Sequence, residues 1–429
     1  MPPKGGQLTV GVSVKVRPQQ RYEGPPAVTV AAATGEVAVA GGPAFAFAHA
    51  LGGSDQERAY AALAAALVDK LRGGFDCTML AYGQTGSGKT YTMLGREGAL
   101  MEAALDEAAG LGERVPADWG LMPRTLMELL GLRREGEAVH ASVIEIYRDS
   151  CYDLLNDKRP LKVGRNAPIV HQAGALAPQD AVRFYHSEDK RKALHGAHPA
   201  GCDCMPCQKV RRDEVAARIA KRDAARAAPK GRRSRARSLS AAPAGKPEAS
   251  FATVGEELWK IEGPGDVARL SRLVEANRSS RGHNLNDRSS RSHCLIRVHF
   301  TRKKPGTAAT ATSKFHFVDL AGSERIGRSG VQGAGQAEAI GINDSLTTLG
   351  RVVNALVKKQ AHVPYRESPL TMLLRDSLAG KAVVRVVICV AAGVEHAEET
   401  VCSLKVRSGM EADRVTHTER ARRGGRGRD

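Results

Sequence analysis

The sequence contains few aromatic residues and no apolar segment long enough to cross a membrane. Phenylalanine, tryptophan and tyrosine make up 4% of the 429 residues, although hydrophobic residues as a whole reach 42%. No apolar run approaches the roughly 18 residues that a membrane-spanning helix needs. The first six residues also lack the apolar stretch of a secretory signal. We therefore expect an ordinary buried core, a cytoplasmic location and no membrane partner.

The cysteines indicate the cellular compartment, and the net charge indicates the kind of partner. Five of the eight cysteines occur singly, which favours a reducing cytosol over a disulfide framework. The 64 lysines and arginines outnumber the 46 aspartates and glutamates, giving a formal net charge of +18. This charge predicts an acidic polymer as the partner, and from charge alone that polymer would be nucleic acid.

The most informative motif is a phosphate-binding loop, the P-loop, at residues 83–90. It reads Gly83-Gln84-Thr85-Gly86-Ser87-Gly88-Lys89-Thr90, which matches G-x-x-x-x-G-K-[ST] in full. The apolar segment 75–82 before it predicts a buried strand, whereas residues 91–94 after it can form a helix. Loop N–H groups would bind a triphosphate, Lys89 would reach its β- and γ-phosphates, and Thr90 would offer a hydroxyl to Mg²⁺. The alternative is a glycine-rich loop that binds nothing.

A second predicted strand, residues 315–319, ends in an aspartate, as Mg²⁺-dependent nucleotide hydrolysis requires. Asp319 would enter the Mg²⁺ shell, and Gly322 would present an unhindered N–H to the γ-phosphate. Leu320 stands where an AAA-type ATPase would place an acid. The Asn-Lys-x-Asp tetrapeptide of Ras-like GTPases does not occur. Both observations exclude common P-loop families.

Five motifs, in order, resemble those of the kinesin motor domain. Residues 286–293, which read N-D-R-S-S-R-S-H, resemble the switch I motif of that family, and residues 319–324, D-L-A-G-S-E, match its switch II motif. Three further motifs are K-V-R-P at 15–18, I-N-D-S-L at 342–346 and P-Y-R-E-S-P-L-T at 364–371. The resemblance runs from about residue 8 to about residue 410, apart from one insertion.

The resemblance implies a fold, ligands and a partner. The fold would be a three-layer α/β P-loop NTPase sandwich, with a mixed central sheet and helices on both faces. ATP and Mg²⁺ would be the ligands. The acidic polymer would be the microtubule, and nucleic acid would not be the partner. The expected location is then the microtubule cytoskeleton.

The resemblance also assigns roles to individual residues. Ser289 and Ser290 would position the attacking water, Gly322 would detect the γ-phosphate, and Arg291 would pair with Glu324 across the two switches. A surface ion pair, worth under about 1 kcal/mol, is the alternative reading of that pair. The Mg²⁺ ligands, partly through water, would be Thr90, Ser290 and Asp319. The nucleotide-binding residues would be Lys15, Arg17, Pro18, Tyr91 and all eight residues of the P-loop, with Lys89 also counted as catalytic and Tyr91 stacking on adenine.

The motor domain is expected at residues 8–415, with a basic insertion at about 187–250 and an Arg/Gly-rich disordered tail at 416–429. The insertion would be either an added basic grip on acidic tubulin tails or a solvated loop without a specific role. Its cluster of Cys202, Cys204 and Cys207, with two nearby histidines, would either hold one Zn²⁺ or consist of free thiols. The tail shows no heptads, so no coiled coil is predicted and a monomer is expected.

Two residues depart from the family pattern in elements that contact the microtubule in kinesins. Asp344 and Pro369 stand where the family commonly has lysine, and both changes would weaken the attraction to an acidic filament. We therefore expect a microtubule motor ATPase that couples Mg·ATP hydrolysis to microtubule binding and movement. The alternative is a microtubule-binding nucleotide switch with weak ATPase activity and no directed motility.

Several elements are expected from periodicity. Segment 8–16 alternates as a half-buried strand, and 139–147, 293–300 and 383–390 are further strands. A helix begins at the capping box of residues 54–57 and ends near Gly73. A long amphipathic helix covers 341–357.

Overall fold

The computed structural model of the chain describes six stretches of residues, namely 10–96, 115–165, 251–279, 291–303, 309–324 and 334–410. The strands of its large sheet are β1 (Val10–Arg17), β5 (Ala50–Gly52), β6 (Asp76–Tyr82), β7 (Ala138–Tyr147), β8 (Ser150–Asp153), β9 (Arg159–Arg165), β10 (Phe251–Val254), β11 (Trp259–Ile261), β12 (His293–Lys303), β13 (Thr310–Asp319) and β14 (Ala382–Ala391). A small sheet consists of β2 (Val28–Ala31), β3 (Glu36–Val39) and β4 (Ala44–Ala46). The helices used below are α1 (Gln56–Leu63), α2 (Ala65–Arg72), α3 (Lys89–Met93), α5 (Leu121–Gly131), α9 (Pro264–Ser279), α10 (Ala334–Val357), α11 (Pro369–Leu373), α12 (Ala397–Met410) and the short turns η3 (Tyr365–Glu367) and η5 (Val394–His396).

The centre of the molecule is one mixed sheet. Its order is β10-β9-β8-β7-β12-β13-β6-β14-β1-β5, and β11 also pairs with β7. The strands β13, β6, β14, β1 and β5 run parallel to one another, whereas β12 is antiparallel to both β13 and β7. Alternation of buried side chains along β13 sends Phe315 and Phe317 to one face and Val318 to the other.

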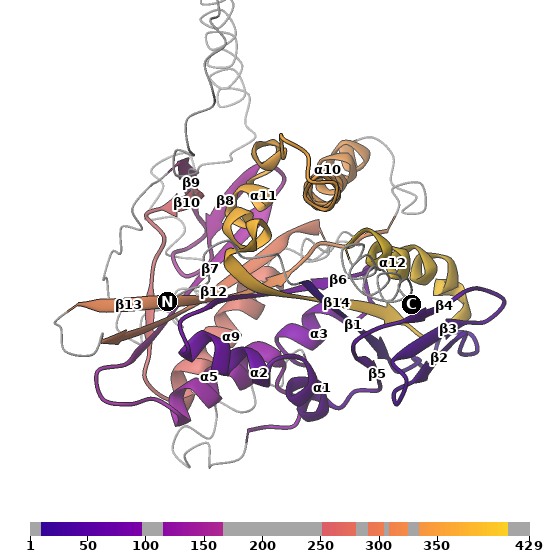
Figure 1. Cartoon of the computed structure of the whole chain (residues 1–429), viewed down its shortest axis with the longest axis horizontal. Helices are drawn as coiled ribbons and strands as arrows, with labels where there is room; N and C mark the ends of the chain where they lie inside the picture. The colour runs from indigo at the N-terminus through magenta and orange to yellow at the C-terminus, as the bar shows by residue number, and fades with distance from the viewer. Residues whose placement is uncertain are drawn as a thin grey trace, which may run out of the picture. The chain divides into compact units, whose positions relative to one another are not determined.

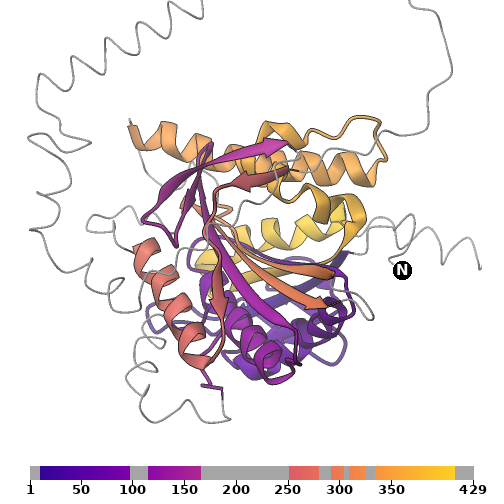
Figure 2. The same cartoon turned by 90° about the vertical axis from the view of Figure 1, so that its left-hand side faces the viewer.

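Helices cover both faces of this sheet (Figures 1 and 2). One face packs against α1, α2, α3, α5 and α9, and the other against α10, α11, α12 and the small sheet. Each side has its own hydrophobic core, so the molecule has three layers. The predicted fold class is therefore confirmed. None of the helices among the described residues is long and apolar enough to span a membrane.

The parallel centre of the sheet decides where a ligand would lie. β6 lies between β13 and β14 and is parallel to both, so the C-terminal ends of all three strands meet at one edge. The P-loop follows β6, switch II follows β13, and η5 follows β14. Ligands in open α/β sheets bind outside the carboxyl ends of the strands. This edge is therefore the candidate site.

Most expected elements agree with the structure, and two differ in extent. The expected strands correspond to β1, β7, β12 and β14. The helix expected after the capping box is two helices, because Ala64 takes φ −117° and ψ −37° between α1 and α2. Its N-cap is Asp55, whose carboxylate accepts from the N–H of Arg58 at 2.9 Å. The long helix α10 begins seven residues before the expected start at 341.

Candidate nucleotide-binding site

The P-loop has the backbone shape that its glycines predict. Gly83 has φ +149° and Gly88 has φ +91°, both in the region that only glycine adopts without strain. A Cβ at Gly83 would lie 2.1 Å from the carbonyl oxygen of Cys389, so β14 leaves no room for a side chain there. Helix α3 begins within the motif, at Lys89, directly after Gly88. The predicted order of strand, loop and helix is confirmed.

Lys89 turns back onto its own loop. Its Nζ donates to the carbonyl oxygens of Gly83 at 2.9 Å and of Gln84 at 2.8 Å. Burial lowers the pKa of Lys89, and the nearby carboxylates of Asp319 and Glu324 act in the opposite direction. A buried ammonium group held at the mouth of the loop is suited to an anionic phosphate.

Asp319 and Thr90 form the part of the site that suits a divalent cation. The Thr90 hydroxyl donates to Asp319 Oδ2 at 2.6 Å. Asp319 is 3% exposed, and its other oxygen, Oδ1, has no hydrogen-bond partner among the described residues. A buried carboxylate oxygen left without a donor, beside a hydroxyl, is a hard oxygen set of the kind that Mg²⁺ prefers. The two residues therefore fit the predicted Mg²⁺ site.

Arg278 on α9 is a site residue that the sequence did not indicate. Its guanidinium forms an ion pair with Asp319 Oδ2, and the two side chains are each 4% exposed. The partners are 41 residues apart, and Arg278 belongs to none of the motifs that carried the family resemblance. The arginine neutralises Asp319 and ties α9 to the start of switch II.

Switch II lies directly against the P-loop. Ser323 N donates to the Gly83 carbonyl at 3.1 Å, and the Glu324 carboxylate accepts from Thr85 N at 2.8 Å and Thr85 Oγ1 at 2.5 Å. Gly322 is enclosed by these contacts, since an added Cβ would lie 2.3 Å from both Glu324 Oε2 and Thr85 Oγ1. Switch II and the P-loop are thus brought together as predicted, and a side chain at residue 322 would fit only if Glu324 and Thr85 moved.

His293, at the end of switch I, connects three elements. Its Nδ1 accepts from Ala321 N of switch II at 3.0 Å, and its Nε2 lies 2.6 Å from Ser345 Oγ on α10. Because Nδ1 accepts, Nε2 carries the hydrogen and donates. Burial lowers the pKa of His293 to about 3, so the imidazole is neutral near pH 7. The sequence marked His293 as part of a motif but gave it no role.

The predicted adenine side contains a buried lysine and a tyrosine. Lys15 Nζ lies 4.8 Å from the centroid of the Tyr91 ring and donates to Gln56 Oε1 at 3.2 Å. The Gln56 amide donates in turn to the Tyr91 carbonyl at 2.6 Å. Burial lowers the pKa of Lys15 to about 8. Adenine stacking on Tyr91, with Arg17 and Pro18 on its other side, stays a prediction.

Two of the predicted catalytic residues fall outside the described stretches, and a third stands at the edge of one. Ser289 and Ser290 lie outside the described residues, as do the cysteine cluster, the insertion and the tail. Arg291 lies half-buried just before β12. Its pairing with Glu324 stays a prediction.

The two departures from the family pattern lie in different environments. The Asp344 side chain is 67% exposed, and Arg351 Nη2 lies 3.8 Å from its carboxylate. Pro369 is buried as the first residue of α11, behind the N-cap Ser368. Proline suits this position, because the first N–H of a helix has no partner within it. The side chain at residue 344 is therefore open to solvent, whereas the one at residue 369 is enclosed within the fold.

Fold and site together define a nucleotide-binding protein of the P-loop class, with switch II against the loop and His293, the last residue of switch I, bonded to switch II. A profile of the kinesin motor domain matches residues 33–189 and 243–411. More than half of the sequence is covered by this match, and the chain belongs to the kinesin motor domain family. The resemblance found in the motifs is thereby confirmed.

Individual relatives agree with this assignment. The chain is 33% identical over 361 residues to kinesin-like protein KIP1 of Eremothecium gossypii, covering 82% of this chain and 27% of that protein. It is 30% identical over 374 residues to kinesin-like protein cut7 of Schizosaccharomyces pombe, covering 82% and 26%. The solved structure of a fast kinesin matches with a TM-score of 0.66 and 24% identity, over 95% of this chain and 93% of that one, which supports the fold. The chain spans less than a third of the length of these two curated relatives.

Proposed function

We propose that the chain is an ATP hydrolase that uses Mg²⁺ and couples turnover to microtubule binding and movement. The observation that carries the proposal is the meeting of Lys89, Asp319 and switch II at one loop. The lysine is buried at the loop mouth, one Asp319 oxygen has no donor within the described part of the chain, and Glu324 accepts hydrogen bonds from the loop itself. Phosphoryl transfer depends on such positioning and charge neutralisation more than on a strong base.

Each residue of the proposed site has a distinct role in hydrolysis. Lys89 would leave the carbonyls of its own loop and neutralise charge on the terminal phosphates. Gly322 would approach the γ-phosphate through its N–H, and Ser289 and Ser290 would hold the attacking water. Thr90, Ser290 and Asp319 would hold Mg²⁺ directly or through water, and the ion would supply positive charge to offset that of the phosphates.

The path from the nucleotide to the filament would pass through His293. Ala321 is the neighbour of Gly322, and its N–H is bonded to the His293 ring, which is bonded in turn to Ser345. A displacement of Gly322 toward a phosphate would therefore pull on α10. In kinesins the corresponding helix contacts the microtubule, so α10 is the proposed output of the site. We also propose that the chain is located on the microtubule cytoskeleton.

The direct test is the steady-state ATPase rate of the purified chain with and without microtubules. We expect stimulation on the order of tenfold or more, since coupling between distant sites commonly reaches that size. Unchanged basal turnover together with nucleotide-dependent filament binding would favour the alternative, a microtubule-binding switch without motility. Parallel reactions with RNA and DNA are expected to show no stimulation.

Asp344→Lys tests the exposed departure from the family pattern. The substitution changes the local charge by two on the exposed side of α10, so we expect microtubule affinity to rise about two- to fivefold at low salt. The gain should fall as salt is added, because exposed charges are screened. Co-sedimentation over a salt series measures it. Glu135→Lys, an exposed reversal between α5 and β7, is the matched control. Equal gains in both variants would show that only net charge matters.

A further inference from the structure

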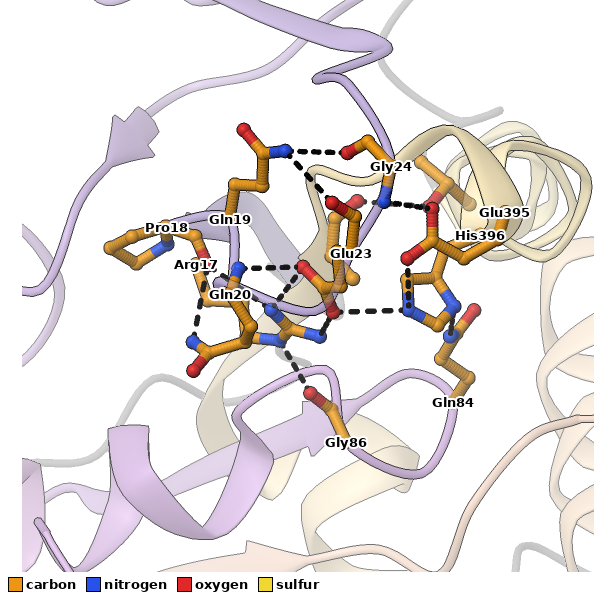
Figure 3. A network of polar contacts seen from close by, with 12 residues as sticks. Arg17, Pro18, Gln19, Gln20, Glu23, Gly24, Gln84, Gly86, Glu395 and His396 are labelled. Carbon is orange, nitrogen blue, oxygen red and sulfur yellow. Dashed lines mark hydrogen bonds and ion pairs between the residues drawn. The ribbon is translucent and has the colours of Figure 1, made fainter.

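A closed ring of hydrogen bonds begins and ends on the P-loop without using its phosphate-binding lysine (Figure 3). Gln84 Nε2 lies 2.8 Å from His396 Nδ1, and His396 Nε2 lies 3.1 Å from Glu23 Oε1. The Glu23 carboxylate accepts from two nitrogens of the Arg17 guanidinium. Arg17 Nε then donates to the Gly86 carbonyl at 2.5 Å, which returns the ring to the loop.

The hydrogen bonds of this ring converge on Glu23, which accepts from His396 on one side and from Arg17 on the other. The Gln84 amide nitrogen is a donor, so His396 Nδ1 accepts and Nε2 carries the hydrogen that is given to Glu23. Arg17 has donors only and fills both Glu23 oxygens. Each member is therefore the partner that its neighbour needs, and loss of one member opens the whole ring.

Glu23 is the hub of the ring. Its side chain is 1% exposed, and the Gln20 N–H also donates to it at 2.8 Å. The hydrogen bond from Arg17 is the largest cause that lowers the pKa of Glu23 to about 2, so the carboxylate is charged at neutral pH. A charged group so enclosed holds its donors tightly, because releasing one would leave the charge buried and unpaired.

A metal ion is a poor explanation of the same cluster. Oxygen and nitrogen atoms of Glu23, Glu395 and His396 lie within 4.8 Å of one another. However, the Glu23 oxygens already bind the Arg17 cation, and Glu395 accepts from Gly24 N at 3.2 Å. A cation there would have to displace a guanidinium group. The ring is better explained as a restraint on the P-loop.

We infer that Glu23 and His396 are positioning residues of the nucleotide site, an inference that rests on the proposed function. Gly86 has φ +76°, and glycines on either side of it leave the loop backbone free to change shape. The ring restrains this loop at Gln84 and at Gly86, and it joins the loop to η5 at the start of α12. Neither Glu23 nor His396 is expected to touch phosphate. They set how readily the loop takes up and releases nucleotide.

The test measures nucleotide handling separately from hydrolysis. In Glu23→Gln and His396→Ala we expect the KM for ATP and the release rate of a fluorescent ADP to rise about tenfold, the size of one lost charge-assisted hydrogen bond. We expect kcat to stay within about twofold, since no transition-state contact is removed. The double variant should resemble either single one, because the ring opens only once. Glu135→Gln and His362→Ala, both at exposed positions, are the controls.

The outcomes separate this inference from the proposed function. If the unmodified chain does not bind Mg·ATP, the proposed function is wrong. If it binds and both variants keep its KM and its ADP release rate, only the inference is wrong. Additive effects in the double variant, or a fall in kcat and melting temperature at unchanged KM, would also overturn it. Glu23→Gln keeps the shape of the side chain that it replaces, so it carries the test alone if the alanine variant does not fold.

Discussion

Gly322→Ala is expected to bind ATP and to lose about 100-fold or more of its turnover, the usual cost of removing one donor to a developing charge. The added methyl carbon would lie 2.3 Å from Thr85 Oγ1 and from Glu324 Oε2, so both side chains must move. Glu324 would leave the P-loop, and the Gly322 N–H would be held away from the γ-phosphate. Binding through Lys89 needs neither change.

Steady-state ATPase assays and titration with a fluorescent ATP analogue together check this expectation. Gly131→Ala is the matched control, because a Cβ there meets nothing within 4 Å. We expect the control to keep the turnover of the unmodified chain. Turnover that survives in Gly322→Ala would show that switch II does not read the terminal phosphate.

Arg278→Ala is expected to lower the free energy of unfolding by about 3–5 kcal/mol, the usual cost of breaking a buried ion pair on one side. Asp319 would be left charged and almost fully enclosed, since it is 3% exposed. The same substitution would release α9 from the start of switch II, so basal turnover should fall as well. Denaturant unfolding followed by circular dichroism measures the first effect, and an ATPase assay the second.

The same helix provides the control for that experiment. Arg269 pairs with Asp266 at 3.3 Å, but both side chains are partly exposed, at 31% and 24%. Arg269→Ala should therefore cost under about 1 kcal/mol. The double variant Arg278→Ala/Asp319→Ala removes both buried charges and should be more stable than Arg278→Ala, but it should be inactive because it also lacks Asp319. Equal stability of Arg278→Ala and the unmodified chain would contradict the buried pair.

The parts of the nucleotide site that lie in short, continuous motifs could be predicted from the sequence. Lys89, Thr90 and Asp319 each stand in a motif whose order of residue types follows from the chemistry of phosphate and Mg²⁺. The strands before both motifs were visible from apolar runs, and their parallel pairing brought the motifs together. Short motifs at the ends of buried strands carry enough information for this.

The rest of the site depends on pairs that no local pattern marks. Glu23 and His396 are 373 residues apart, and each is an ordinary polar residue in its own segment. Arg278 could not be predicted for the same reason, although its partner Asp319 is only 41 residues away. The break at Ala64 was also invisible, because alanine favours a continuous helix and only packing decides otherwise. Pro369 was interpreted as a lost charge, whereas its burial at the first turn of α11 gives it a structural reason.

Because β6 lies between two parallel neighbours, a movement of the P-loop can reach two other parts of the molecule. Its C-terminal end carries the loop that would receive the nucleotide, β13 continues into the segment bonded to His293, and β14 continues into η5 and His396. One strand thus leads toward α10 and the other toward α12. A nucleotide that shifted the loop would therefore displace α10 and α12 at the same moment and by separate routes.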